Sequence, residues 1–202
     1  MAITALALNC TLKADPAVDS STDRMIALLE KALSDVDVTL TETVRVAAHN
    51  VLPGVTSDEG DGDDWPAIRA KILKADILIL GGPIWMGQIS SVAKRVLERM
   101  DAFISETDDA GRMPSYGKVA VAAIVGNEDG AHFSSAKLFQ ALNDVGFTIP
   151  AVAACYWVGE AMGSTDFKDL AETPEKVAKT AKMVAGNAAH LARLLADSPY
   201  PG

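Results

Sequence analysis

Short, nearly continuous apolar runs alternate with amphipathic stretches along the whole chain, and this alternation restricts the fold more than any other feature. The runs predict buried strands at residues 3–10, 36–47, 76–80, 118–125 and 148–158. Helical spacing of apolar residues predicts helices at residues 22–34, from 64 toward the third strand, from 90 or 91 to about 104, at 134–145 and at 174–195. Apolar strands are typical of a parallel sheet covered on both faces, and alternation implies right-handed crossovers. The sequence therefore predicts an α/β fold with one doubly wound, five-stranded parallel sheet.

Composition excludes several classes of protein. The 202 residues suit one domain, residues 1–202, and no apolar run approaches the roughly 18–20 residues of a membrane span. Without a basic N-terminal region that would mark a signal peptide, we expect a cytoplasmic location. The net charge of −9 argues against nucleic acid or an anionic membrane as partner. A small anionic cofactor remains compatible, since backbone dipoles bind phosphate inside acidic proteins.

The two cysteines and three histidines of the chain do not form a metal-binding pattern. Cys10 ends the first predicted strand and Cys155 lies on the fifth, so the expected strand order separates them and no disulfide is predicted. A catalytic thiol at Cys10 is conceivable beside a helix start. A small buried hydrophobe is the better interpretation.

The loop after the first strand, residues 9–22, combines hydroxyl side chains with the start of a helix. It contains neither G-x-G-x-x-G nor G-x-x-x-x-G-K-[ST], which excludes a dinucleotide fingerprint and a P-loop. Free N–H groups at a helix start favour an anion, and hydroxyls suit a phosphate monoester. An ordinary N-cap at residues 20–22 is the alternative. The candidate phosphate ligands are Thr11, Lys13, Ser20, Ser21 and Thr22.

The loop after the third strand is unusually apolar and reads "GGPIWMGQISS". Two glycines let the backbone come close to a ligand, and a proline stiffens the turn. The apolar side chains can supply a flat edge while backbone N–H groups point at ring heteroatoms. Packing beneath the next helix, or a subunit contact, is the alternative. The candidate ring-binding residues are Pro83, Ile84, Trp85, Met86 and Gly87.

The loop after the fourth strand, "GNEDGAHF", can surround the polar edge of a ring with backbone groups. Its spacing of acids does not match a calcium loop, and an ordinary strand–helix turn is the alternative. The candidates here are Gly126, Asn127, Glu128, Asp129 and Gly130. All three loops follow strands whose carboxyl ends meet where the strand order reverses, the ligand position in such sheets. A phosphate end, an apolar plane and a polar rim together indicate a site for flavin mononucleotide (FMN).

The chain resembles the flavodoxin-like NAD(P)H-dependent FMN reductases and the related multimeric flavodoxin quinone reductases. The resemblance is carried by "TLKADPAVDSST", "DILILGGPIWMGQISSVAKRVLERMD" and "GKVAVAAIVGNEDGAHFSS", and covers nearly the whole chain in element order. It implies a flavodoxin-like strand order 2-1-3-4-5 and FMN held by its phosphate, its isoalloxazine ring and the pyrimidine edge of the ring at the three loops in turn. The family's arginine in the first loop corresponds to Lys13, which lacks the bidentate fork, and "ADPAVD" lengthens that loop.

The implied activity is electron transfer from NAD(P)H to a quinone, flavin or similar small acceptor by a ping-pong hydride mechanism. Because the flavin carries the chemistry, no catalytic side chain is assigned. Three cations, Lys13, Arg112 and Lys118, could meet dinucleotide phosphates, or could be solvated surface charges.

The sequence also bears on two other classes of protein and on the assembly. A flavodoxin-type electron carrier serving protein partners is the alternative function. A receiver-type domain is disfavoured, because the positions that need acids read Asn9-Cys10 and Gly81-Gly82. The large apolar side chains of Trp85 and Met86 in a loop predict a homodimer or homotetramer.

Overall fold

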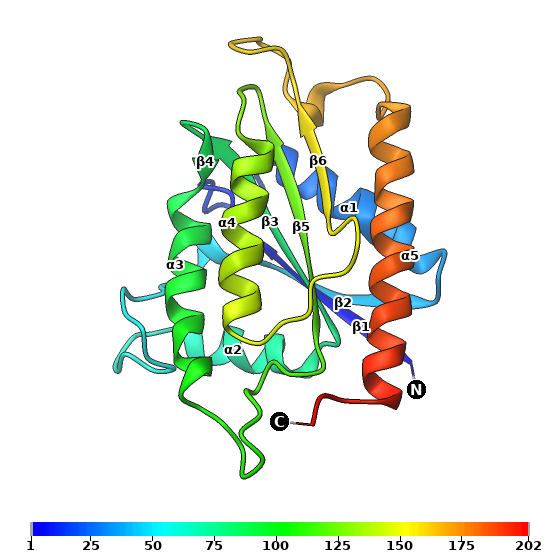
Figure 1. Cartoon of the computed structure of the whole chain (residues 1–202). Coiled ribbons are helices and arrows are strands. Elements are labelled where there is room, and N and C mark those ends of the chain that lie inside the picture. The colour runs from blue at the N-terminus through cyan, green and yellow to red at the C-terminus, as the bar shows by residue number, and fades with distance from the viewer. Residues whose placement is uncertain (1, 202) are drawn as a thin grey trace.

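The computed structural model describes residues 2–201 and is a three-layer α/β structure (Figure 1). The strands are β1 (Ile3–Asn9), β2 (Val38–Arg45), β3 (Ile77–Trp85), β4 (Gln88–Ile89), β5 (Val119–Gly126) and β6 (Ala154–Val158). The helices are α1 (Ser21–Ser34), α2 (Trp65–Lys74), α3 (Ser91–Met100), α4 (Ala131–Asp144) and α5 (Glu175–Asp197). Short 3₁₀ turns are η1 (Val46–Ala48), η2 (Asp101–Ile104) and η3 (Phe167–Asp169).

The sheet confirms the predicted topology. Five parallel strands run in the order β2-β1-β3-β5-β6, and the two-residue β4 pairs antiparallel with β3 outside this path. Because the short β4 is counted in the numbering, β5 and β6 are the fourth and fifth strands of the parallel sheet. The observed order is therefore the predicted order 2-1-3-4-5. The order reverses between β1 and β3, where Asn9 pairs with Gly81. Ligands of doubly wound sheets bind at that reversal.

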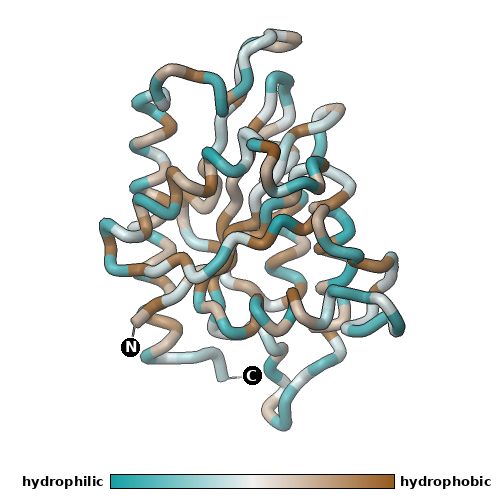
Figure 2. Tube along the Cα trace, turned by 180° about the vertical axis from the view of Figure 1, so that it is seen from behind, coloured by the Kyte–Doolittle hydropathy of each residue, from teal (hydrophilic) through white to brown (hydrophobic). Residues whose placement is uncertain are grey.

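Helices cover both faces of the sheet, as the apolar strands require. α1 and α5 pack on one face through a core that includes Met25, Leu29 and Val184. α2, α3 and α4 pack on the other through residues such as Ile68 and Val96. Seen from behind, hydrophobic residues gather in the central strands and hydrophilic residues in the connections (Figure 2). Among residues 2–201, no helix is long and apolar enough to cross a membrane.

Three predicted boundaries were wrong. β3 continues through Gly81–Trp85, predicted as loop, because these residues pair with β5 and then turn back into β4. α4 starts at Ala131, three residues before the predicted start, directly after Gly130 at its N-cap position. β6 starts at Ala154, because a turn with Val152 at φ 54° interrupts the chain after the isolated bridge at Thr148.

A buried ion pair holds the long acidic loop at residues 49–64. The Asp63–Arg99 pair spans 2.6 Å with both side chains fully buried, and Arg99 also donates to the carbonyls of Leu52 and Thr56. Burial by itself would raise the pKa of Asp63. The Arg99 guanidinium and three backbone amides outweigh burial and hold the pKa of that carboxyl well below its ordinary value.

Replacing Asp63 with Asn should lower the free energy of unfolding by about 3–5 kcal/mol at neutral pH, because it leaves a buried guanidinium without its partner charge. The pKa of Asp63 is lower in the folded than in the unfolded chain. The wild-type advantage is therefore complete above about pH 5 and shrinks as the pH falls through the unfolded value near 4. Urea denaturation at about pH 7 and about pH 3 measures both, with Asp61→Asn in the same loop as control. Because the advantage is fully lost only below the folded pKa, the difference at about pH 3 should be smaller than at about pH 7 without vanishing. Equal stability at neutral pH, or a difference that does not shrink between about pH 7 and about pH 3, would contradict the assignment.

Candidate functional site

A cavity of about 340 Å³ opens at the carboxyl-terminal edge of the sheet, bordered by the connections after β1, β3, β5 and β6. It brings the three predicted loops together. The predicted residues that line it are Thr11, Lys13, Ser20, Ser21, Thr22, Pro83, Ile84, Trp85, Gly126, Asn127 and Glu128. The other candidates belong to the same loops but do not line the cavity, and they are Met86, Gly87, Asp129 and Gly130.

The start of α1 forms one end of the cavity. Ser20 is the N-cap: its hydroxyl accepts from the Asp23 amide and donates to the Asp23 carboxylate at 2.8 Å. That hydroxyl hydrogen is therefore already used, as the N-cap alternative predicted. Ser21 and Thr22 lie in the first turn, where a helix leaves its N–H groups without intrahelical partners. Within residues 2–201 neither of these two hydroxyls donates a hydrogen bond, so both can serve an anion.

A partly buried network of polar side chains fixes the shape of this end. The Asn9 amide donates to Asp23 at 2.5 Å and accepts from the Thr11 amide at 3.0 Å. Arg45, at the end of β2, pairs with the same Asp23 carboxylate at 2.6 Å and donates to the carbonyl of Val18. The arginine charge offsets the Asp23 carboxylate, so the acid in the first turn does not cancel the attraction of the helix start for anions.

Gly81 makes room for the first turn of α1. A side chain on Gly81 would place its Cβ 3.0 Å from Thr22 Cγ2 and from Ile26 Cδ1. The absence of a side chain lets α1 pack closely on β3, with Thr22 at the cavity. The predicted close approach of this glycine is therefore an approach to the helix start at the site.

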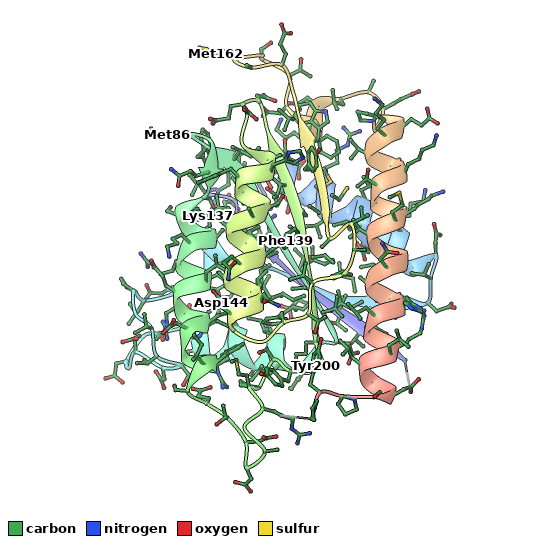
Figure 3. The ribbon with its side chains drawn as sticks, in the orientation of Figure 1. Met86, Lys137, Phe139, Asp144, Met162 and Tyr200 are labelled. Atoms are coloured by element: carbon green, nitrogen blue, oxygen red, sulfur yellow. The ribbon has the colours of Figure 1, made fainter. Side chains whose placement is uncertain are left out.

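The apolar loop is the tip of the β3–β4 hairpin. Trp85 pairs with Gln88 across a two-residue turn in which Met86 and Gly87 have φ values of 53° and 74°. Positive φ at both positions is the geometry of a type I′ hairpin turn. Trp85 is half-exposed and lines the cavity, and Met86 projects outward at the tip (Figure 3).

Glu128 connects this hairpin to the loop after β5. Its two carboxylate oxygens accept from the amides of Met86 at 3.0 Å and Gly87 at 2.9 Å. Gly130 is tightly packed as well, because a Cβ there would lie 2.5 Å from the Gly87 carbonyl oxygen. The Met86 and Gly87 amides, which were predicted to face ring heteroatoms, are therefore bound to Glu128 instead.

The fourth wall comes from β6 and the connection that follows it, which sequence reasoning missed. Its lining residues are Trp157, Asp166 and Phe167. Two further lining residues that were not predicted, Leu12 and Val125, belong to the connection after β1 and to β5. Phe167 is fully buried, and its ring lies 5.4 Å from that of Trp157. A single aromatic residue in the polar stretch "GSTDFKDL" was the available signal, because a lone apolar side chain in a polar loop usually has a partner to bury it.

Arg24 on α1 holds this fourth wall in place. Its guanidinium donates to the carbonyls of Phe167 at 2.8 Å, Lys168 at 3.1 Å and Leu170 at 2.6 Å. It also stacks 5.1 Å from the centre of the Phe167 ring. One side chain thus joins the first helix to a segment more than 140 residues away in sequence.

The three candidate cations do not act together. Lys13 lines the cavity and donates to the carbonyl of Asp19 at 2.7 Å. Lys118 and Arg112 precede β5 and so lie toward the opposite edge of the sheet. Lys118 is half-buried, donates to the Ala75 carbonyl, and has a pKa lowered by burial. Arg112 pairs with Asp108. A role for these last two at the cavity is excluded by their position.

Neither cysteine is suited to nucleophilic chemistry. Cys10 and Cys155 are both buried and both free, so the predicted absence of a disulfide between them is confirmed. Burial raises the pKa of the Cys10 thiol far above its ordinary value and that of Cys155 to about 12. Both thiols are protonated at neutral pH, and the interpretation of Cys10 as a small buried residue holds.

Comparisons with known proteins point to flavin chemistry. A family model described as NADPH-dependent FMN reductase matches residues 3–162. The 8-demethyl-8-aminoriboflavin-5'-phosphate synthase of Streptomyces davaonensis is 32% identical over 213 residues, which cover 99% of this chain and 81% of that protein. A divalent metal cation transporter, MntH, of Mycobacterium bovis is 37% identical over 169 residues, covering 82% of this chain but 24% of the transporter.

Solved structures share the fold. The crystal structure of RosB with a bound intermediate, 8-demethyl-8-formylriboflavin-5'-phosphate, has a TM-score of 0.86 and 30% identity, and the match covers 100% of this chain and 83% of RosB. The apo form of an NADH:FMN oxidoreductase, EMOB, has a TM-score of 0.64 and 17% identity, with 95% and 89% of the two chains covered. At 17% identity, the similarity to EMOB shows only that the two proteins share a fold.

Replacing Arg24 with Ala should loosen the wall formed by residues 159–173. Hydrogen bonds from a charged donor contribute about 1.5–3 kcal/mol each, so trypsin cleavage after Lys168 in the native protein should accelerate by about tenfold or more. The control is Arg193→Ala, which removes an exposed arginine that donates to one carbonyl, that of Val36. Cleavage at the wild-type rate would show that Arg24 does not hold the wall.

Proposed function

The chain belongs to the family of NADPH-dependent FMN reductases, and from this membership we propose that it binds one FMN in the cavity and passes electrons from NAD(P)H to a small acceptor. The observation that supports this most directly is that one cavity joins the first turn of α1 to the apolar hairpin at Trp85. A quinone or a flavin is the proposed class of acceptor, and a ping-pong order is proposed for the two half-reactions.

The residues around the cavity fit the cofactor. A phosphate monoester needs donors, which the amides of the first turn and the hydroxyls of Ser21 and Thr22 offer. An aromatic ring needs apolar surfaces, which Ile84, Trp85 and Trp157 offer. The volume of about 340 Å³ is within the range of small-molecule sites.

When bound, FMN supplies the ring that accepts and donates hydride. The chain's own part is to hold and orient. The start of α1 fixes the phosphate end, and the Glu128 contacts hold the hairpin against the β5–α4 loop. The half-exposed Trp85 marks the side of the cavity that solvent reaches. Donor and acceptor can take turns there, which is the basis for the proposed ping-pong order.

A second candidate function treats the flavin phosphate as the substrate. It is favoured by the full-length likeness to an 8-demethyl-8-aminoriboflavin-5'-phosphate synthase and by the modified flavin phosphate bound in RosB. The same cavity would then hold a riboflavin 5'-phosphate whose ring is altered instead of cycled between redox states. A flavodoxin-type carrier serving protein partners is the third possibility.

We also propose that the chain forms a homodimer or homotetramer. Met86 is 89% exposed and Trp85 is 53% exposed. Both residues border a second, wider hollow of about 660 Å³ between α3 and α4, whose floor includes Ile89 and Leu97. An apolar surface of this kind beside a ligand site is typical of an interface between subunits.

The purified protein should bind FMN at about one flavin per chain, because the cavity offers donors for the phosphate and apolar side chains for the ring. It should also oxidise NAD(P)H when a quinone is present. Titration of the flavin absorbance measures the first property, and the nicotinamide absorbance measures the second. Mass spectrometry of the flavin after many turnovers separates the candidates. An unchanged flavin supports a reductase, and a flavin of altered mass supports the second function. FMN binding without NAD(P)H oxidation supports the carrier, and no flavin binding contradicts all three.

Replacing Thr22 with Val should weaken FMN far more than riboflavin, since the two ligands differ only by the phosphate. A hydrogen bond to a charged group contributes about 1.5–3 kcal/mol, so FMN affinity should fall by about tenfold or more. The control is Ser20→Ala, which removes the helix cap at about 0.5–2 kcal/mol of stability and should affect both flavins alike. Equal losses of FMN and riboflavin in the Thr22 variant would place the phosphate elsewhere.

A further inference from the structure

The connection between β6 and α5, residues 159–173, is the wall segment described above. It continues beyond residue 162, where the match to the family model ends, and it contributes Asp166 and Phe167 to the cavity lining. Its outer tip carries Met162, which is 98% exposed and points away from the body of the protein (Figure 3). The inner part of the wall segment therefore lines the cavity but lies outside the residues that the family model matches.

The wall segment is attached to both ends of the cavity. At the ring end, the Asn127 side chain donates to Asp166 Oδ1 at 2.9 Å, and the Met162 amide donates to the Asn127 carbonyl at 3.1 Å. At the phosphate end, the Lys168 amide donates to the Ser21 hydroxyl at 3.2 Å, beside the contacts of Arg24. Asp166 lines the cavity, is bound to Asn127, and is two residues from Lys168, whose amide is bound to Ser21 at the phosphate end. Its carboxylate therefore lines the cavity on the stretch that joins the ring end to the phosphate end.

A carboxylate at this place sets a chemical requirement on the ligand. An ionised carboxylate only accepts hydrogen bonds, and one donor from Asn127 leaves acceptor capacity on Asp166. It repels a phosphate and gains nothing from the apolar faces of a ring. The group beside it should therefore carry hydroxyl or N–H hydrogens. From one end to the other, the cavity suits an anion, then a chain with donors, then a flat apolar ring.

We propose that Asp166 is a specificity-determining residue that accepts hydrogen bonds from the hydroxyl groups of a polyol chain. Resting on the proposed binding of FMN, this inference names the ribityl chain as the group recognised in the middle of the cavity. Asn127 is its positioning partner, because it holds one carboxylate oxygen and leaves the other free for the ligand. Flavin phosphates without chain hydroxyls should then bind less well.

The test compares FMN with a synthetic isoalloxazine whose phosphate is carried on a plain pentyl chain. Both are titrated into wild type, Asp166→Ala, Asp166→Asn and Asp169→Asn. In the alanine variant FMN should lose about tenfold to a hundredfold in affinity, and the pentyl analogue less than about twofold. Asp166→Asn keeps one acceptor without the charge and should fall between. Asp169, which pairs with Lys168 and does not line the cavity, is the matched control for charge and should leave both affinities unchanged.

The outcomes separate this inference from the proposed function. If wild type binds neither ligand, the proposed function fails. If wild type binds FMN and Asp166→Ala binds it equally well, or loses FMN and the pentyl analogue in equal proportion, the role of Asp166 in reading hydroxyls is overturned. Trypsin cleavage after Lys168 at the wild-type rate in the alanine variant confirms that the wall segment is still docked. A selective loss of FMN alone, with the wall docked, supports the inference.

Discussion

A parallel sheet covered by helices on both faces has little room for polar side chains along its central strands, and the rest of this molecule depends on that restriction. β1, β3 and β5 are buried almost throughout, so chemistry is confined to the connections beyond their carboxyl ends. The reversal of strand order between β1 and β3 then opens space at one place on that edge. Gly81 completes the arrangement, because a side chain there would crowd Thr22 and Ile26 in the first turns of α1.

Arginines hold the long connections that the sheet itself cannot order. Arg45 fixes the turn after β1, Arg99 fixes the acidic loop before α2, and Arg24 fixes the connection after β6. Each donates to carbonyl oxygens of a segment far away in sequence, and a guanidinium suits this role because it offers five donors in a rigid plane. Two of these loops border the cavity. The shape of the site is therefore set by helix and strand residues that do not themselves line it.

The succession of strands and helices and the three loops after β1, β3 and β5 could be predicted, because hydrophobic periodicity and turn residues are local signals. The strand order was predicted from the resemblance to flavodoxin-like proteins. The β3–β4 hairpin could not be predicted, since a proline and two glycines are typical of a loop, whereas Gly81–Pro83 pair with β5 and Ile84 and Trp85 pair with β4. The wall of Trp157, Asp166 and Phe167 was missed for a related reason: it depends on contacts of Arg24 and Asn127 across the fold. Ser20 was predicted among the phosphate ligands, but its hydroxyl is occupied by Asp23, a competition that only geometry reveals.

The central claim is that one cavity holds a flavin phosphate with its phosphate at α1 and its ring at the β3–β4 hairpin. A crystal structure of the protein grown with FMN tests it most directly. We expect phosphate oxygens within about 2.7–3.2 Å of the first-turn amides of α1, the ring against Trp85, and the ribityl chain beside Asp166. A phosphate bound away from α1, or a ring outside the space between Trp85 and Trp157, would contradict the account.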